Sequence, residues 1–239
     1  MKDSETLRSK DGNFTLGFFT PQNSAKRYVG IWWKSESTVI WVANRNQSLN
    51  DSSGVVTISE DGNPVVLNRQ KQVIWSTNVY NSSFNTSSKL SDSGKLVLTE
   101  NTTGNKSLWD SFQQPLNTLL PGMKLSSNRR TSTEVELTSW KSPSNPSVGS
   151  FSCSVVQRIN IVEVFIWNWN VETRPYWRSG PWNGGIFTGI PTMSPYLNGF
   201  KVGDDGEGNT DVYFTLPSAL EFVIYMMNWQ GQLEAKLVR

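Results

Sequence analysis

Val39-Ile40-Trp41-Val42-Ala43-Asn44 is a short apolar segment around one tryptophan, and segments like it recur twice further along the chain. Their tryptophans are Trp75 and Trp109, and the spacing is constant because 75 − 41 and 109 − 75 are both 34. A fixed period of roughly 20–50 residues is typical of a fold built from copies of one supersecondary unit. Each copy follows a strand, a turn such as Asp61-Gly62-Asn63 and a second strand, so we predict three units whose indoles share one core.

The composition favours an all-β protein without catalytic machinery. Charged residues make up 18% of the 239 residues, against roughly 25% in average soluble domains. The chain has no histidine, which removes histidine-based triads and the commonest general base. Its formal net charge is +2 and no basic stripe alternates with aromatic residues, so we expect no nucleic-acid partner. We expect no enzyme activity, no catalytic residue, no cofactor and no metal site.

The single cysteine, Cys153, cannot form an internal disulfide. It stands in the alternating segment Phe151-Ser152-Cys153-Ser154-Val155, which is typical of a strand with a buried face. We therefore expect a buried and inert thiol; the alternative is a cysteine whose partner is missing.

Membrane and targeting signals are not visible in this sequence. No stretch approaches the roughly 20 apolar residues that span a bilayer. The first residues, Met1-Lys2-Asp3-Ser4-Glu5, lack the apolar core of a signal peptide. We expect no membrane contact by this chain itself.

Two domains are predicted, with a boundary at the proline- and glycine-containing segment 115–122. Residues 1–122 hold the three repeats, with strand patterns interrupted by turn residues. Residues 123–239 show the same kind of pattern less regularly, which predicts a second copy of the first domain. In it, Val162-Glu163-Val164-Phe165-Ile166-Trp167 is followed by Tyr176-Trp177-Arg178-Ser179-Gly180, the same order of strand, turn and tryptophan segment.

Further motifs stand in one order along the chain: Phe14–Phe19, Arg27–Trp32, Trp41–Arg45, Leu119–Met123 and Tyr176–Gly184. With the repeats, they resemble the bulb-type, mannose-specific plant lectins, and more specifically the S-locus glycoproteins and the ectodomains of S-domain (G-type lectin) receptor-like kinases. The resemblance implies a bulb-type lectin β-prism with three-fold pseudo-symmetry over 1–122. It implies a second, incomplete β-prism, the S-locus glycoprotein domain, over 123–239. The kinase motifs of the resembled receptors are absent from this sequence.

The resemblance also identifies a candidate carbohydrate site. Bulb-type lectins bind mannose with the motif Gln-x-Asp-x-Asn-x-Val-x-Tyr, whose alternate residues face one side of a strand. The best match is degenerate, because serine and leucine replace glutamine and tyrosine; its residues are Ser59, Asp61, Asn63, Val65 and Leu67. Compared with the full motif, two polar contacts are lost, each worth roughly 0.5–1.5 kcal/mol. The whole binding free energy of a millimolar monosaccharide site is only about −4 kcal/mol. We favour the alternative that Asp61-Gly62-Asn63 is only a hairpin turn.

Two further patterns in the sequence resemble binding or modification sites. The acidic segment Gly203–Asp211 lacks the spacing of an EF-hand, so we expect a turn between two strands. The chain has seven sequons for N-glycosylation, against roughly four or five expected by chance in a chain this rich in serine and threonine, so their number is weak evidence for glycosylation. Besides Asn13, they begin at Asn46, Asn50, Asn81, Asn85, Asn101 and Asn105. Asn81 and Asn101 stand in expected turns and are the best candidates.

The function implied by the resemblance is non-catalytic recognition at the plant cell surface, including recognition of pollen type. The partner would be a peptide or protein ligand, or a glycan, and homo- or heterodimers with related receptors are possible. One alternative is a mannose-binding lectin. Another is a fragment of a truncated gene without independent activity.

Overall fold

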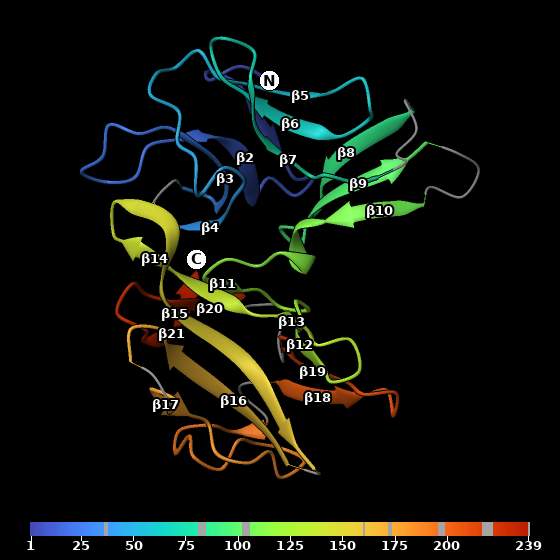
Figure 1. Ribbon diagram of the computed structural model, residues 1–239, viewed down its shortest axis with the longest axis vertical. Helices are drawn as coiled ribbons and strands as arrows, with labels where there is room; N and C mark the ends of the chain where they lie inside the picture. Colours follow the sequence, from blue (N-terminus) through green and yellow to red (C-terminus); the bar gives the residue numbers. More distant parts are fainter. Residues whose placement is uncertain are drawn as a thin grey trace. The chain divides into compact units, whose positions relative to one another are not determined.

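The computed structural model describes residues 1–35, 38–80, 85–101, 106–159, 161–171, 174–195, 199–216 and 222–238 (Figure 1). Its strands form six antiparallel sheets, so the predicted all-β fold is confirmed. No helix in these ranges is long and apolar enough to cross a membrane.

The chain forms two compact units, Met1–Gln113 with Ser142–Val148, and Gln114–Lys141 with Gly149–Arg239. The predicted boundary at residue 122 stays a prediction. In the structure the first unit also includes Ser142–Val148, which form the tip of a hairpin further along the chain. Arg45 Nε donates to the Pro146 carbonyl at 2.8 Å, and Ser147 Oγ donates to the Arg45 carbonyl at 3.1 Å. Arg45 is buried, and its burial lowers its pKa to about 10.

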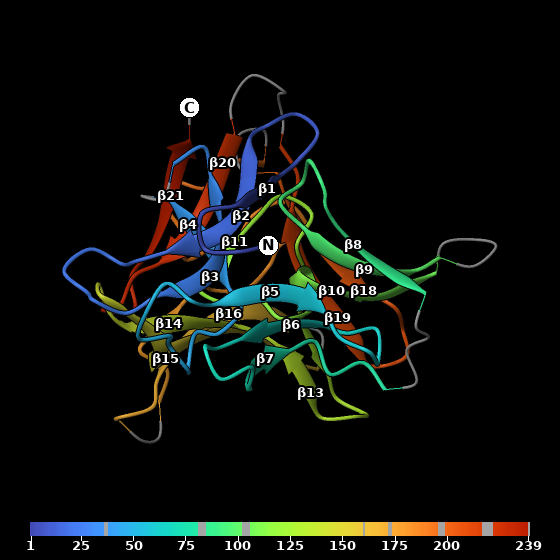
Figure 2. The same cartoon turned by 90° about the horizontal axis from the view of Figure 1, so that it is seen from above.

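The first unit has three sheets, one for each repeat of the sequence, and Figure 2 shows them as three separate groups. The first sheet consists of β1 (Thr6–Arg8), β2 (Phe14–Phe19), β3 (Tyr28–Trp33) and β4 (Val39–Val42). The second consists of β5 (Val55–Ile58), β6 (Pro64–Leu67) and β7 (Val73–Ser76). The third consists of β8 (Thr86–Leu90), β9 (Leu96–Glu100) and β10 (Ser107–Asp110), and the 3-10 helix η1 (Ser111–Gln113) follows it.

Each of these sheets carries the same irregularity. The register shifts once between β3 and β4, once between β6 and β7, and once between β9 and β10. Such bulges bend a strand and increase its twist. The repeated position of the bulge, next to the tryptophan strand, shows that the three units share one backbone plan.

The structure brings together the three repeated tryptophans. The ring centroids lie 5.6 Å apart for Trp41 and Trp75, and 6.0 Å apart for each of them and Trp109. All three pairs are edge-to-face, the geometry in which the positive edge of one ring meets the negative face of the next. Because each indole comes from a different sheet, the cluster links all three sheets of the unit.

The first sheet shows why glycines interrupt its apolar strands. Every residue of β2 and β3 is buried, and Gly17 lies directly opposite Gly30 in the ladder. A Cβ atom on Gly17 would come within 2.7 Å of the Trp32 ring, and one on Gly30 within 2.6 Å of the Phe19 ring. The two glycines therefore make room for aromatic side chains that fill the core.

The second unit also contains three sheets. One consists of β11 (Thr118–Leu119), β20 (Phe222–Met227) and β21 (Leu233–Val238). Another consists of β12 (Leu125–Asn128), β13 (Thr133–Val135), β18 (Phe200–Asp204) and β19 (Asn209–Phe214). The last consists of β14 (Leu137–Ser142), β15 (Asn145–Arg158), β16 (Ile161–Asn168) and β17 (Trp177–Arg178).

The core of the second unit is apolar and includes the cysteine. Phe165, Phe214 and Ile224 are fully buried in it, each from a different sheet. Cys153 on β15 is also fully buried, as expected from the alternation around it. Burial raises the pKa of its thiol to about 12, so the reactive thiolate form is disfavoured.

Candidate functional site

The five residues of the lectin-like motif lie on the turn between β5 and β6 and along β6. The turn is closed by two backbone bonds, from Ser59 N to the Asn63 carbonyl and from Gly62 N to the Ser59 carbonyl, both of 2.9 Å. Gly62 has φ of 79°, a left-handed conformation that glycine adopts without strain. Ser59 Oγ donates to the Asp61 carboxylate, and this bond lowers the pKa of Asp61. These contacts are those of a tight, internally bonded hairpin turn.

The Asn63 side chain is turned into the protein. It is 2% exposed, and its Oδ1 accepts hydrogen bonds from Thr77 Oγ1 at 2.7 Å and from Val79 N at 2.8 Å. Its Nδ2 donates to the Val79 carbonyl at 3.2 Å. A sugar hydroxyl could reach this amide only by displacing bonds that hold the chain after β7.

The remaining motif positions offer little to a sugar ring. Val65 is 3% exposed and lies on β6, paired with β5 and β7 on its two sides. Leu67 is half-buried at the position where the lectin motif has tyrosine, so no phenol is present there. Of the five residues, only the exposed Asp61 offers a charged group to solvent.

A similar turn recurs in the other two repeats. Ser91 N donates to the carbonyl four residues on, that of Lys95, and Ser9 N donates to the carbonyl five residues on, that of Phe14, both at 2.9 Å. In each case the following glycine, Gly12 or Gly94, donates its N–H to the serine carbonyl at 3.0 Å. The serine in the place of the lectin glutamine is therefore a turn residue in all three repeats.

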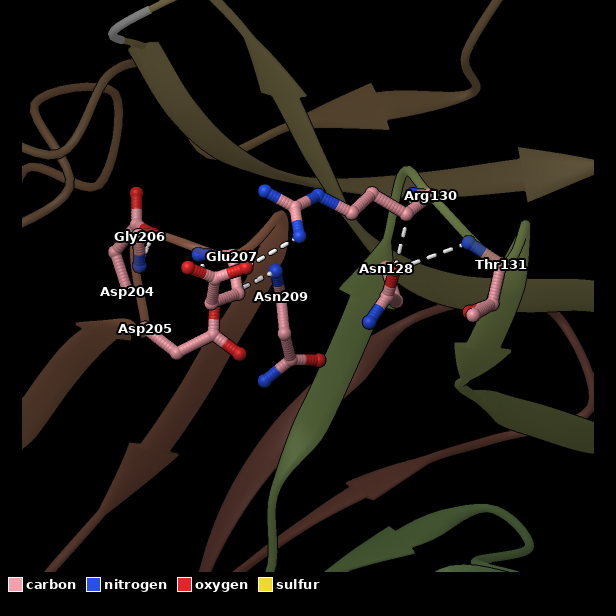
Figure 3. A network of polar contacts seen from close by, with 8 residues as sticks. All are labelled: Asn128, Arg130, Thr131, Asp204, Asp205, Gly206, Glu207 and Asn209. Atoms are coloured by element: carbon pink, nitrogen blue, oxygen red, sulfur yellow. Dashed lines mark hydrogen bonds and ion pairs between the residues drawn. The ribbon is translucent and has the colours of Figure 1, made fainter.

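The acidic segment of the second unit is a turn between β18 and β19. Asp205 Oδ1 accepts from Glu207 N at 2.7 Å and from Asn209 N at 3.0 Å, and the Glu207 carboxylate pairs with Arg130 (Figure 3). Hydrogen bonds from these backbone amides lower the pKa of Asp205. Within the ranges that the structure describes, no three potential metal ligands gather at one point.

The sequon asparagines that the structure describes are mostly exposed, with side chains in hydrogen bonds. Asn46 Oδ1 accepts from Val148 N at 3.1 Å, and Asn50 Oδ1 accepts from Lys26 Nζ at 2.6 Å. Asn85 and Asn101 face each other. Asn101 Nδ2 donates to Asn85 Oδ1 at 3.2 Å, and Asn85 Nδ2 donates to the Asn101 carbonyl at 3.1 Å. Asn81 and Asn105 lie outside the described residues.

Two pockets formed by the described residues were not predicted from the sequence. One is an apolar cavity of about 500 Å³ in the first unit, next to Trp41 and Trp75. The other is a cleft of about 500 Å³ in the second unit, lined by side chains that include Tyr176, Trp177 and Gln232. The pair Tyr176-Trp177 was visible in the sequence as a motif, but its place beside Gln232 depends on the tertiary fold.

Comparison with known families gives two matches along the chain. Residues 38–141 match the model of the D-mannose binding lectin family, and residues 177–238 match that of the S-locus glycoprotein domain. The second match lies wholly within the second compact unit.

Comparison with curated proteins finds receptor kinases of Arabidopsis thaliana. A G-type lectin S-receptor-like serine/threonine-protein kinase is 43% identical over 240 residues, which is 98% of this chain and 29% of the relative. The kinase of the same description named SD1-13 is 42% identical over 223 residues, 89% of this chain and 26% of the relative. The chain thus spans less than a third of the length of either relative.

Among solved structures, the Japanese Marasmius oreades lectin aligns with 46% of this chain and 82% of its own. Its TM-score is 0.34 and its sequence identity 16%. The match to the lectin family precedes the match to the S-locus glycoprotein domain along the chain. The chain therefore contains a match to a D-mannose binding lectin domain followed by a match to an S-locus glycoprotein domain, and it is similar over nearly its whole length to G-type lectin S-receptor-like kinases.

Proposed function

We propose that this chain is a non-catalytic recognition module that acts at the surface of a plant cell. The proposal is supported by its similarity to receptor kinases over nearly its whole length. Those relatives are named as kinases. The glycine loop and the Asp-Phe-Gly motif of a kinase do not occur in this sequence. The partner is a peptide or protein ligand, or a glycan, and recognition of pollen type is one form that such a role takes. Dimers with a related receptor or with a second copy fit the same role.

The main support for the proposal is that side chains of the lectin-like motif are engaged within the fold. The amide of Asn63 is occupied by Thr77 and Val79, and Val65 is buried in its sheet. A module whose mannose motif serves as a turn is expected to recognise its partner elsewhere on its surface. This favours a general recognition function over a monosaccharide lectin.

A chimaeric receptor tests the proposal. Residues 1–239 would replace the matching part of the 43% identical relative, and the chimaera would be displayed on plant cells and challenged with fractionated extracts of cell wall and pollen coat. We expect protease accessibility from outside the cell, and phosphorylation of the kinase in response to at least one fraction. A chimaera that is displayed but silent to every fraction, beside a responsive unaltered relative, would contradict the proposal.

The second candidate function is a mannose lectin, which the match of residues 38–141 to the D-mannose binding lectin model favours. Calorimetry with methyl α-mannoside separates it from the first. We expect no binding tighter than about millimolar, because Asp61 is the one charged group among the motif side chains and its carboxylate already accepts from Ser59 Oγ. A micromolar constant that disappears in Asp61→Ala would make the lectin function the better one.

A further inference from the structure

The second unit carries three large aromatic side chains that are exposed to solvent. Trp169 is 64% exposed and Tyr176 is 55% exposed, and both belong to the connection from β16 to β17. Trp229, in the turn from β20 to β21, is 45% exposed. Single exposed apolar side chains are ordinary, but a group of large ones marks an interaction site.

Phe151 lies next to one of these rings and next to the two turns that carry the others. Its ring centroid lies 5.2 Å from that of Tyr176, in edge-to-face geometry. The preceding carbonyl, that of Ser150, accepts the N–H of Trp169 at 2.9 Å. The ring also covers Gly231, where a Cβ atom would come within 2.3 Å of it. The two turns that carry Trp169 and Trp229 therefore meet at Phe151. We call Trp169, Tyr176 and Trp229 the aromatic rim.

One residue of the aromatic rim, Tyr176, lines the cleft of the second unit, and so do Gly231 and Gln232 from the turn that carries Trp229. The cleft volume of about 500 Å³ falls within the roughly 300–1,000 Å³ of small-molecule sites. The strands that contribute to it, β16, β17, β18, β20 and β21, come from all three sheets of the unit (Figure 1).

Two aromatic side chains that line the cleft, Phe200 and Tyr225, pack against each other. The Phe200 and Tyr225 centroids lie 5.1 Å apart, and Phe214 supports Tyr225 from 4.9 Å. In the turn that carries Trp229, Asn228 Nδ2 donates to Gln232 Oε1 at 2.8 Å, and this bond fixes the orientation of the Gln232 amide. A cleft whose walls are already packed loses little freedom when a ligand enters it.

The polar groups that the described residues bring to the cleft are all uncharged. No lysine, arginine, aspartate or glutamate is among the described residues that line it. The Gln232 amide nitrogen, the Tyr176 hydroxyl and the Trp177 indole N–H have no hydrogen-bond partner among the described residues. They are therefore available to a ligand. An ionised ligand would lose its hydration beside these side chains without gaining a counter-charge from them, so they favour a neutral ligand.

We propose that the cleft and the aromatic rim together bind a neutral oligosaccharide of equatorially substituted pyranose rings, such as a β-1,4-linked glucan. Each ring of such a glucan has its hydroxyls around its edge and only C–H groups on its two faces. The faces can pack on the flat rings of Tyr176, Trp169 and Trp229, while the edge hydroxyls can bond to Gln232. This inference rests on the proposed recognition function and gives it a ligand class and a site.

Titration of the full chain with cellohexaose, followed by calorimetry and tryptophan fluorescence, tests the inference. We expect millimolar or tighter binding, and a loss of at least about fivefold in affinity in Tyr176→Ala and in Trp229→Ala, since each removes one packing face. Tyr176→Phe keeps the ring and should retain most of the affinity. Tyr80→Ala is the matched control, because Tyr80 is 91% exposed and belongs to the first unit.

Several results would overturn the inference. One is no binding of cellohexaose by the wild-type chain, or an equal loss in Tyr80→Ala and Tyr176→Ala while circular dichroism shows both folded. Equal binding of the acidic hexagalacturonate, or binding of a proline-rich peptide in place of the glucan, would show that the ligand class is wrong. If the chimaeric receptor responds to an extract while cellohexaose does not bind, the site is wrong and the proposed function stands. If cellohexaose binds through Tyr176 while the chimaera is silent, the site stands and the receptor role fails.

Discussion

Replacing Asn63 by alanine tests whether the asparagine of the lectin-like motif maintains the fold or serves a sugar. The change removes the hydrogen bonds to Thr77 Oγ1, Val79 N and the Val79 carbonyl, at 2.7, 2.8 and 3.2 Å. At roughly 0.5–1.5 kcal/mol for each bond, the three together contribute about 1.5–4.5 kcal/mol. Whole domains have about 5–15 kcal/mol of stability. We therefore expect Asn63→Ala to unfold at a clearly lower urea concentration than the wild type.

Tryptophan fluorescence is a suitable assay, because Trp41, Trp75 and Trp109 form the core of the same unit. The matched control is Asp61→Ala, which changes an exposed side chain two residues away in the same turn. It should shift the midpoint much less. A sugar-binding role for Asn63 predicts the reverse, namely wild-type stability in both variants and a loss of mannose affinity. An unchanged urea midpoint in Asn63→Ala would refute the structural reasoning.

Two further predictions concern the turn glycines and the thiol. Gly12 and Gly94 occupy equivalent turns with φ of 77° and 81°, but only at Gly94 would a Cβ atom meet the Phe14 ring, at 2.5 Å. Gly12→Ala should cost about 1–2 kcal/mol and Gly94→Ala more, by urea unfolding; equal midpoints would argue against the contact. Cys153 should resist iodoacetamide at about pH 8 until the chain is denatured, because its thiol is buried with a pKa raised to about 12. Rapid labelling of the native chain would contradict that burial.

Local patterns were enough to predict the repeated plan of the first unit. The 34-residue period of Trp41, Trp75 and Trp109 reflects one strand-turn-strand unit in three copies, and such units bury their apolar faces only against each other. The turn at Asp61-Gly62-Asn63 was equally readable, because its serine, carboxylate and left-handed glycine interact within five residues. Alternation around Cys153 was enough to predict its burial, since successive side chains of a strand face opposite sides.

The tertiary structure decided what the sequence could not. The occupants of the Asn63 amide, Thr77 and Val79, lie 14 and 16 residues further on. Arg45 meets Pro146 across 101 residues. The cleft is assembled from three sheets, and no segment of the chain contains more than a small part of it. Periodicity records which side chains a strand buries, because that depends on neighbouring residues. The pairing of distant strands depends on how all the buried faces pack at once, and a functional surface made from them appears only in the folded chain.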